Sequence, residues 1–189
     1  MIHAVITDPT LVLVTGPPGT GKSTIAEAVA TRLAAPVLAW DWAMAGLTPF
    51  AEIQSVLDRL ERTQVRQVGW SVLRSLATAQ LRNDRSAVLD GTARTPEIDA
   101  TRRLADELGA CCIVIATHCS DPAVHRARIE GRSRRIPGWY ELDWPHVADF
   151  LAAWQHPDRV DLDLDAIDPL AGNLARLDRL LDQSRPSAR

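Results

Sequence analysis

Nine residues constrain the fold of this 189-residue chain more than any others. Gly16–Thr24 read GPPGTGKST and match the spacing G-x-x-x-x-G-K-[ST] of a phosphate-binding loop. The stretch before them, Leu11–Thr15, is a short apolar run typical of a strand buried on both faces. After them, Ile25, Val29 and Leu33 recur at helical spacing. A nucleotide-binding loop requires this strand–loop–helix order, which predicts an α/β fold.

Each fixed position of the loop has a chemical reason. Glycines let the backbone curl so that successive N–H groups converge on one anion, and the helix that follows adds the positive end of its dipole. Lys22 is the only lysine among 21 basic residues and is expected to reach the β- and γ-phosphates, while Ser23 is expected to bind Mg²⁺. The sequence thus predicts ATP and Mg²⁺ as cofactors, bound by Gly16, Pro17, Pro18, Gly19, Thr20, Gly21, Lys22, Ser23 and Thr24.

Strand-like and helix-like segments alternate along the rest of the chain. Such alternation is typical of a parallel sheet with helices on both sides. We expect one domain over residues 1–183 and a flexible tail at 184–189. The expected fold is a three-layer α/β/α P-loop NTPase, nucleotide-kinase-like, with a mainly parallel sheet of about five strands and a helical lid at about 122–145. The expected strands are Leu11–Thr15, Val37–Trp40, Ser86–Asp90, Cys111–Thr117 and Val160–Leu164.

Threonine or aspartate before proline marks several expected helix starts, among them Thr48, Thr95, Asp121 and Asp168. The helix from Asp121 is expected to reach about Arg132. Two apolar faces are expected in the middle of the chain. They consist of Phe50, Ile53, Leu57 and Leu60 in one helix, and of Val65, Val68, Val72 and Leu76 in the next, from about Gln64 to Leu81.

Two aspartates stand where strands end. Asp41 follows the second expected strand and Asp90 ends the third. Because the carboxyl ends of parallel strands face the ligand crevice, both are expected on the same rim as the loop. Asp41 is a candidate general base for an acceptor hydroxyl, with a capping or surface role as the alternative. Asp90 is a candidate Mg²⁺ ligand (directly or through water), a substrate contact or a turn residue; Thr92 and Arg94 are candidate substrate contacts.

Basic charge is concentrated in one segment, which contains Arg126, Arg128, Arg132, Arg134 and Arg135. At helical spacing Arg128 and Arg132 share one face, and both are candidate catalytic cations for the γ-phosphate. Arg134 and Arg135 lie in the adjoining loop, which is expected to close over ATP, and Arg135 is a candidate substrate contact. A solvated basic face is the alternative.

The order of these motifs is similar to that of a known group of enzymes. GPPGTGKST, then Asp41, then AVLDGT, then the pair Arg128 and Arg132 resembles the P-loop kinases related to polynucleotide 5′-hydroxyl kinase, chloramphenicol phosphotransferase and zeta toxins. The resemblance covers roughly Leu11–Leu181. It implies a kinase that transfers the γ-phosphate of ATP·Mg²⁺ to a hydroxyl group.

The resemblance also implies roles for single residues. Asp41 would activate the acceptor hydroxyl, Lys22 and Ser23 would act as the loop lysine and serine, and Arg128 and Arg132 would be the lid arginines. The group often has polar residues beside its catalytic aspartate, whereas tryptophans flank Asp41 here. Its substrate contacts therefore do not carry over.

Composition excludes several partners. The net charge of −3 and the pI of about 5.9 provide no broad basic field for extended nucleic acids. No run approaches the ~20 apolar residues of a membrane span, and Met1–Thr10 does not resemble a secretory signal. Three cysteines cannot all pair, which indicates reduced thiols and a cytoplasmic location.

Several residues with metal-binding side chains are interpreted as structural. Cys111 and Cys112 are adjacent on a strand and so point to opposite faces, unlike a zinc knuckle. Core thiols are therefore favoured over a metal site that would also include His118 and Cys119. Asp161, Asp163 and Asp165 are expected on the wetter face of a strand. Trp139, Tyr140 and Trp144 either stack on a planar ligand or pack in the lid.

Three functions remain open from the sequence. The first is a hydroxyl kinase acting on a small molecule, a nucleotide or a nucleic-acid end. The second is a nucleotide-dependent ATPase or switch without an acceptor; a guanine-reading N-K-x-D motif is absent. The third is a toxin-like kinase of sugar nucleotides. The oligomeric state is left open.

Overall fold

The computed structural model describes residues 8–183, so the expectations for Met1–Thr10 and for the tail at 184–189 fall largely outside it. At its centre is a five-stranded sheet, all parallel, with the strand order β2-β3-β1-β4-β5. This topology confirms the predicted α/β, P-loop-type fold. The strands are β1 (Thr10–Thr15), β2 (Val37–Ala39), β3 (Ala87–Asp90), β4 (Cys111–His118) and β5 (Leu162–Asp165).

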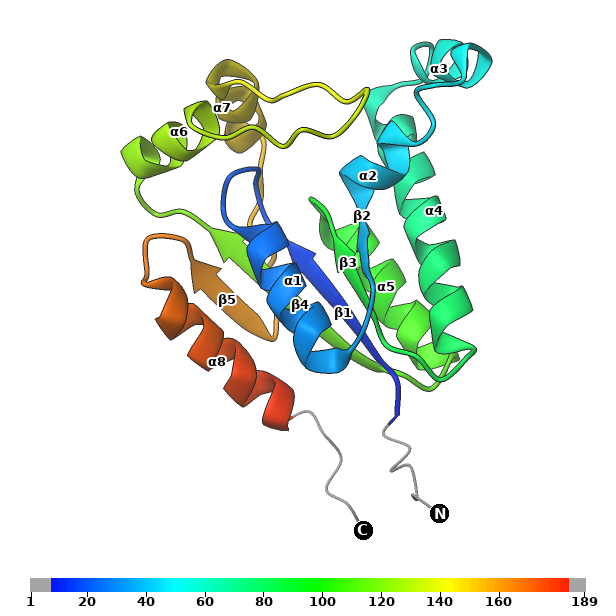
Figure 1. Ribbon diagram of the computed structural model, residues 1–189, viewed down its shortest axis with the longest axis vertical. Helices are drawn as coiled ribbons and strands as arrows, with labels where there is room; N and C mark the ends of the chain where they lie inside the picture. Colours follow the sequence, from blue (N-terminus) through cyan, green and yellow to red (C-terminus); the bar gives the residue numbers. More distant parts are fainter. Residues whose placement is uncertain (1–7, 184–189) are drawn as a thin grey trace.

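Helices cover both faces of the sheet (Figure 1). One face is covered by α1 (Lys22–Leu33) and α8 (Leu170–Gln183), and the other by α4 (Arg62–Leu81) and α5 (Thr95–Glu107). The central strands are therefore buried on both faces, which explains their continuous apolar sequence. The two cores share no side chain: one contains Val12, Val14, Ile25, Val29 and Leu177, and the other contains Leu11, Leu13, Trp70, Leu73 and Ile98.

The remaining helices lie over the carboxyl ends of the strands. They are α2 (Trp40–Ala45), α3 (Ala51–Leu57), α6 (Pro122–Glu130) and α7 (Trp144–Ala152). Figure 1 shows the segment between α6 and α7 running above the sheet toward α2. We call residues 131–143 the crossing segment. Among residues 8–183, no helix combines the length and apolar character needed to span a bilayer.

The predicted helix after Thr48 is wrong in its start and in its buried face. The Thr48 hydroxyl donates a hydrogen bond to the carbonyl of Ala45, 2.8 Å away, and so ends the preceding helix rather than capping a new one. The next helix, α3, begins at Ala51 and buries none of its residues. Phe50 and Ile53 are 57% and 40% exposed. The first half of the expected apolar face is therefore exposed, while Leu57 and Leu60 are only partly buried.

The buried stripe of α4 is rotated relative to the prediction. Trp70, Leu73, Ala77 and Leu81 face the core, whereas Leu76 is 46% exposed. Trp70 is the largest fully buried side chain in the described part of the chain, and its packing sets the rotation of the helix. The apolar valines chosen from the sequence lie next to this stripe and are only partly buried.

Candidate active site

The loop between β1 and α1 is closely packed against the end of β4. A Cβ atom at Gly16, where φ is 142°, would lie 2.1 Å from the carbonyl oxygen of Thr117, so only glycine fits. Gly21 precedes α1 with a φ of 86°, a left-handed conformation that glycine adopts without a steric penalty. The first turn of α1 thus presents unpaired N–H groups to the space above the sheet, as an anion-binding loop requires.

Side chains from distant elements hold the loop in place. His125, which is 3% exposed, donates from Nε2 to the carbonyl of Pro18 at 2.6 Å. The Thr20 hydroxyl donates to the carbonyl of Pro17 at 2.8 Å and lies 2.6 Å from the Thr117 hydroxyl. Thr20 is thus buried inside the loop and supports its shape rather than facing the ligand space.

Lys22 is poised between the loop and two carboxylates. Its Nζ donates to the carbonyl of Pro17 at 2.9 Å. Burial lowers the pKa of Lys22, the negative charges of Asp90 and Asp41 act in the opposite direction, and Arg132 lowers the pKa further. An ammonium in this position lacks full compensation for its lost hydration, so an anion beside it would be stabilised.

Ser23 and Asp90 form a small oxygen site beneath the loop. The Ser23 hydroxyl donates to Oδ2 of Asp90 at 2.8 Å, and Asp90 is only 7% exposed. Burial raises the pKa of Asp90, while the charge of Lys22 and the hydrogen bond from Ser23 lower it. A hydroxyl and a carboxylate at this spacing fit the oxygen ligands that Mg²⁺ prefers, and a cation there would compensate the buried charge.

Asp41 lies in the first turn of α2, and both of its carboxylate oxygens are hydrogen-bonded. Oδ2 accepts from Nη1 of Arg134, and Oδ1 accepts from Nε1 of Trp139 at 3.2 Å. Both donors belong to the crossing segment. The ring of Trp139 also meets the ring of Trp40 edge-on, with centroids 6.0 Å apart. The crossing segment is therefore docked on Asp41.

The arginines differ from the sequence prediction in their arrangement. Helix α6 ends at Glu130, so Arg132 lies beyond it and does not share a helical face with Arg128. Arg128 is exposed and donates from Nη2 to the carbonyl of Ala166 at 2.6 Å. Within residues 8–183, the Arg132 guanidinium has no hydrogen-bond or ion-pair partner. Burial and the nearby Arg134 lower the pKa of Arg132, and Asp41 acts in the opposite direction.

A single cavity of about 1960 Å³ joins these groups. Most predicted site residues line it: Pro18, Gly19, Gly21, Lys22, Ser23, Thr24, Asp41, Asp90, Thr92, Arg94, Arg128 and Arg132. The structure does not bring Gly16, Pro17, Thr20 or Arg135 to the cavity wall. Trp139 and Tyr140 also line it, whereas the Trp144 ring packs against His125, with centroids 5.6 Å apart.

Two further candidate contacts have defined surroundings. The Thr92 hydroxyl donates to the carbonyl of Gly16 at 3.0 Å and so supports the loop as well as lining the cavity. Arg94 is exposed, and its backbone N–H donates to Glu97 at 2.9 Å at the start of α5. Its guanidinium side chain therefore extends from a fixed helix start.

The sequence reading missed Glu141. Its Oε1 accepts from the backbone N–H groups of Arg134 and Arg135 at 2.8 and 3.0 Å. These backbone hydrogen bonds, with Arg135 contributing most, hold the pKa of Glu141 below its usual value. Arg135 has a φ of 51°, so its backbone turns sharply, and of the two arginines only Arg134 lines the cavity. A lone glutamate after a basic loop was the only signal for this organising role.

Comparison with known proteins places the chain in a family. A family model described as an AAA domain (AAA_33) matches residues 11–156. The chain belongs to this AAA domain family. The match includes the phosphate-binding loop, both aspartates and the arginine segment of this AAA-domain protein. No curated protein is similar enough in sequence to match.

Several solved structures share the fold of this AAA-domain protein. The APS kinase CysC of Mycobacterium tuberculosis, in complex with AMPPNP and APS, is 18% identical, with a TM-score of 0.63 over 93% of this chain and 98% of that one. A gluconokinase from Sinorhizobium meliloti 1021 is 21% identical, with a TM-score of 0.62 over 94% and 98%. A sugar kinase from Janibacter sp. HTCC2649 is 20% identical, with a TM-score of 0.62 over 92% and 95%. These structural neighbours are small P-loop kinases.

Proposed function

We propose that this AAA-domain protein is a phosphotransferase that moves the γ-phosphate of ATP to a hydroxyl group of a small molecule. The observation that carries the proposal is the shared cavity, which brings Asp41 and Lys22 to one space. Its volume of about 1960 Å³ exceeds the roughly 300–1,000 Å³ of an ordinary ligand pocket. A nucleotide and an acceptor can therefore bind side by side.

The nucleotide half of the site consists of the loop and α1. The backbone N–H groups of the loop and the Lys22 ammonium would bind the β- and γ-phosphates of ATP. Ser23 and Asp90 would hold Mg²⁺, which offsets phosphate charge when bound. Arg132, a cation without a partner in the described part of the chain, could neutralise charge on the transferred phosphoryl group. Arg128 is placed for the same task only if it leaves the carbonyl of Ala166.

Asp41 would orient the acceptor and remove its proton. In the transfer the acceptor O–H bond breaks and its proton passes to the Asp41 carboxylate. An O–P bond forms to the γ-phosphorus while the bond to the bridging oxygen breaks, and ADP leaves. Both Asp41 oxygens accept from the crossing segment, so we expect this segment to act as a lid that exchanges partners when the acceptor binds.

The acceptor half of the cavity suggests a polar, compact substrate. The Arg94 guanidinium can donate hydrogen bonds, the Thr92 hydroxyl oxygen can accept one, and Trp139 and Tyr140 offer aromatic faces. The structural neighbours named for APS and for gluconate or sugar phosphorylation support a small hydroxyl compound. The resemblance to polynucleotide 5′-hydroxyl kinase and zeta toxins extends the candidates to nucleotides, nucleic-acid ends and sugar nucleotides. Free thiols and the need for ATP are consistent with a cytoplasmic enzyme.

One experiment separates a kinase from a nucleotide switch. ADP formation is measured with ATP and Mg²⁺, with and without panels of sugars, nucleosides and nucleotide alcohols. A kinase forms ADP faster with its acceptor and yields a phosphorylated product detectable by mass spectrometry. Equal ADP formation with every alcohol, at the rate seen with none, would leave only a switch or an ATPase.

A further inference from the structure

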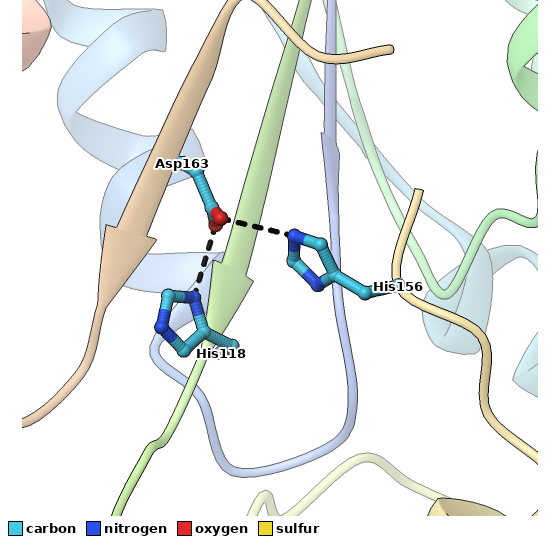
Figure 2. Close-up of side chains that lie close together, drawn as sticks. All are labelled: His118, His156 and Asp163. Carbon is cyan, nitrogen blue, oxygen red and sulfur yellow. Dashed lines mark hydrogen bonds and ion pairs between the residues drawn. The ribbon is translucent and has the colours of Figure 1, made fainter. Parts of the chain in front are cut away.

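Two histidines and an aspartate meet outside the large cavity, at the edge of the sheet (Figure 2). His118 ends β4, Asp163 lies in the edge strand β5, and His156 belongs to the connection between α7 and β5. The three side chains are 37%, 40% and 40% exposed, so ions in solution can reach them. The active-site proposal does not involve any of the three.

The three side chains converge on one point. Asp163 Oδ1 lies 3.0 Å from His118 Nδ1, and its Oδ2 lies 3.0 Å from His156 Nε2. One ligand atom from each residue lies within 4.8 Å of the other two. Ligand atoms that are each about 2.0–2.2 Å from one metal ion lie about 3–3.5 Å from one another. The cluster therefore needs only a small closure to surround a metal ion.

Asp165 lies close to the outer nitrogen of the first histidine. Its Oδ2 lies 3.4 Å from His118 Nε2, while its Oδ1 accepts from the backbone N–H groups of Ser120 and Ile167, both at 3.1 Å. A carboxylate on the outer nitrogen holds the proton there and leaves Nδ1 as a ligand, as around many metal sites. The nearby Arg176 donates to the backbone carbonyl of Asp163 at 2.7 Å.

The donor set favours a transition metal. Two imidazoles and one carboxylate are a common zinc set, whereas Mg²⁺ and Ca²⁺ take oxygen ligands. We propose that His118, His156 and Asp163 bind Zn²⁺, with Asp165 positioning His118. A network of ion pairs between the same residues is the competing explanation, and the test below separates the two.

A zinc ion bound by these residues would link two segments that are adjacent in sequence to active-site elements. His118 directly follows Thr117, whose carbonyl packs against Gly16 of the phosphate-binding loop. His156 follows α7, which leads out of the crossing segment. The ion would therefore anchor the stem of the crossing segment to the sheet. Its expected role is structural, and it is independent of the phosphotransferase proposal.

The test is a calorimetric titration of the full chain, stripped with a chelator, with Zn²⁺. The titration contains excess Mg²⁺ and is carried out without nucleotide, so that Zn²⁺ does not bind to oxygen ligands such as those of Ser23 and Asp90. One equivalent is expected to bind and to raise the melting temperature. Removing a ligand in His118→Ala or His156→Ala should weaken binding by at least about 100-fold, and Asp165→Asn should weaken it by about 10–100-fold.

The matched control is His146→Ala, because His146 also pairs with a carboxylate, that of Asp143, at 2.6 Å, without a second histidine. This variant should keep wild-type affinity. Melting curves without zinc check that each variant folds, and the visible spectrum of the Co²⁺-loaded wild type is a readout that needs no variant. No zinc binding by the wild type, unchanged binding in both ligand variants, or a Co²⁺ spectrum without nitrogen ligation would overturn the proposal.

Discussion

Replacing Asp41 by asparagine separates its proposed chemistry from its structural role. Asparagine has nearly the same shape and still accepts a hydrogen bond from Trp139, but it cannot take up a proton from an acceptor hydroxyl. It also loses the charge that faces Arg134. The effect on turnover should therefore be large, and the effect on folding and on ATP affinity small.

The sizes of the two effects follow from the surroundings of Asp41. Its side chain is 40% exposed, so the ion pair with Arg134 is screened by solvent and contributes about 0–1 kcal/mol to folding. For a chain of this length, that corresponds to about 2–4 °C in melting temperature at most. Losing a general base costs about 10²–10⁴-fold in rate, or about 2.7–5.5 kcal/mol of barrier.

The assay compares Asp41→Asn with Glu130→Gln in acceptor-dependent ADP formation, ATP affinity and melting temperature. Glu130 is also a half-exposed carboxylate paired with an arginine, Arg126 at 2.8 Å, but it lies outside the cavity. Glu130→Gln should match the wild type in all three measurements. If Asp41→Asn retains full turnover, or if its loss is explained by weaker ATP binding, Asp41 is not the base.

Four further substitutions and one alkylation reaction test the structure. Gly16→Ala should abolish the ATP-induced rise in melting temperature, because its Cβ would lie 2.1 Å from a carbonyl oxygen. Gly172 lies in open space within α8, so Gly172→Ala should instead raise the free energy of unfolding in urea by about 0.5–1 kcal/mol. Trp70→Ala should lower the free energy of unfolding by about 3–5 kcal/mol, because the ring is 1% exposed; a loss below about 1 kcal/mol would contradict its core position. Arg132→Ala should reduce turnover by at least about 10-fold with ATP affinity changed only a few-fold, measured by steady-state kinetics and calorimetry. Burial raises the pKa of Cys112 to about 12, which lowers the fraction of reactive thiolate at pH 8. Alkylation of Cys112, measured by peptide mass spectrometry, should therefore be at least about 100-fold slower in the native protein than in urea.

The strands could be predicted because buried parallel strands are apolar throughout. Four of the five expected strands begin and end within one residue of those observed. β5 starts two residues late because Asp161 holds the backbone of Val114 with both its N–H group, at 2.8 Å, and its carboxylate, at 2.7 Å. An alternating pattern of polar and apolar residues does not show that a side chain, rather than the backbone, accepts a hydrogen bond from the neighbouring strand. Cys111 and Cys112 do pack on opposite faces, as predicted.

The candidate site was only partly predictable, because some of its contacts join residues that are far apart in the sequence. Lys22 and Ser23 begin the helix that follows β1 through the loop motif, and Asp90 ends β3, so the parallel sheet brings these positions to one edge. The contact between Asp41 and Arg134 spans 93 residues and depends on a loop shaped by Glu141. The metal-binding cluster was passed over because His156 stands in an irregular connection, where spacing carries no information about neighbours.

The docking of the crossing segment on Asp41 affects whether water can react with ATP in place of the acceptor. If Asp41 is the proton acceptor, its carboxylate is engaged at rest, since one oxygen accepts from Arg134 and the other from Trp139. Water reaches this 40% exposed carboxylate, but a water molecule makes few contacts that would hold the crossing segment open, whereas an acceptor with several contacts in the cavity can do so. Selection against futile ATP hydrolysis would then be a property of the resting conformation, before any substrate arrives.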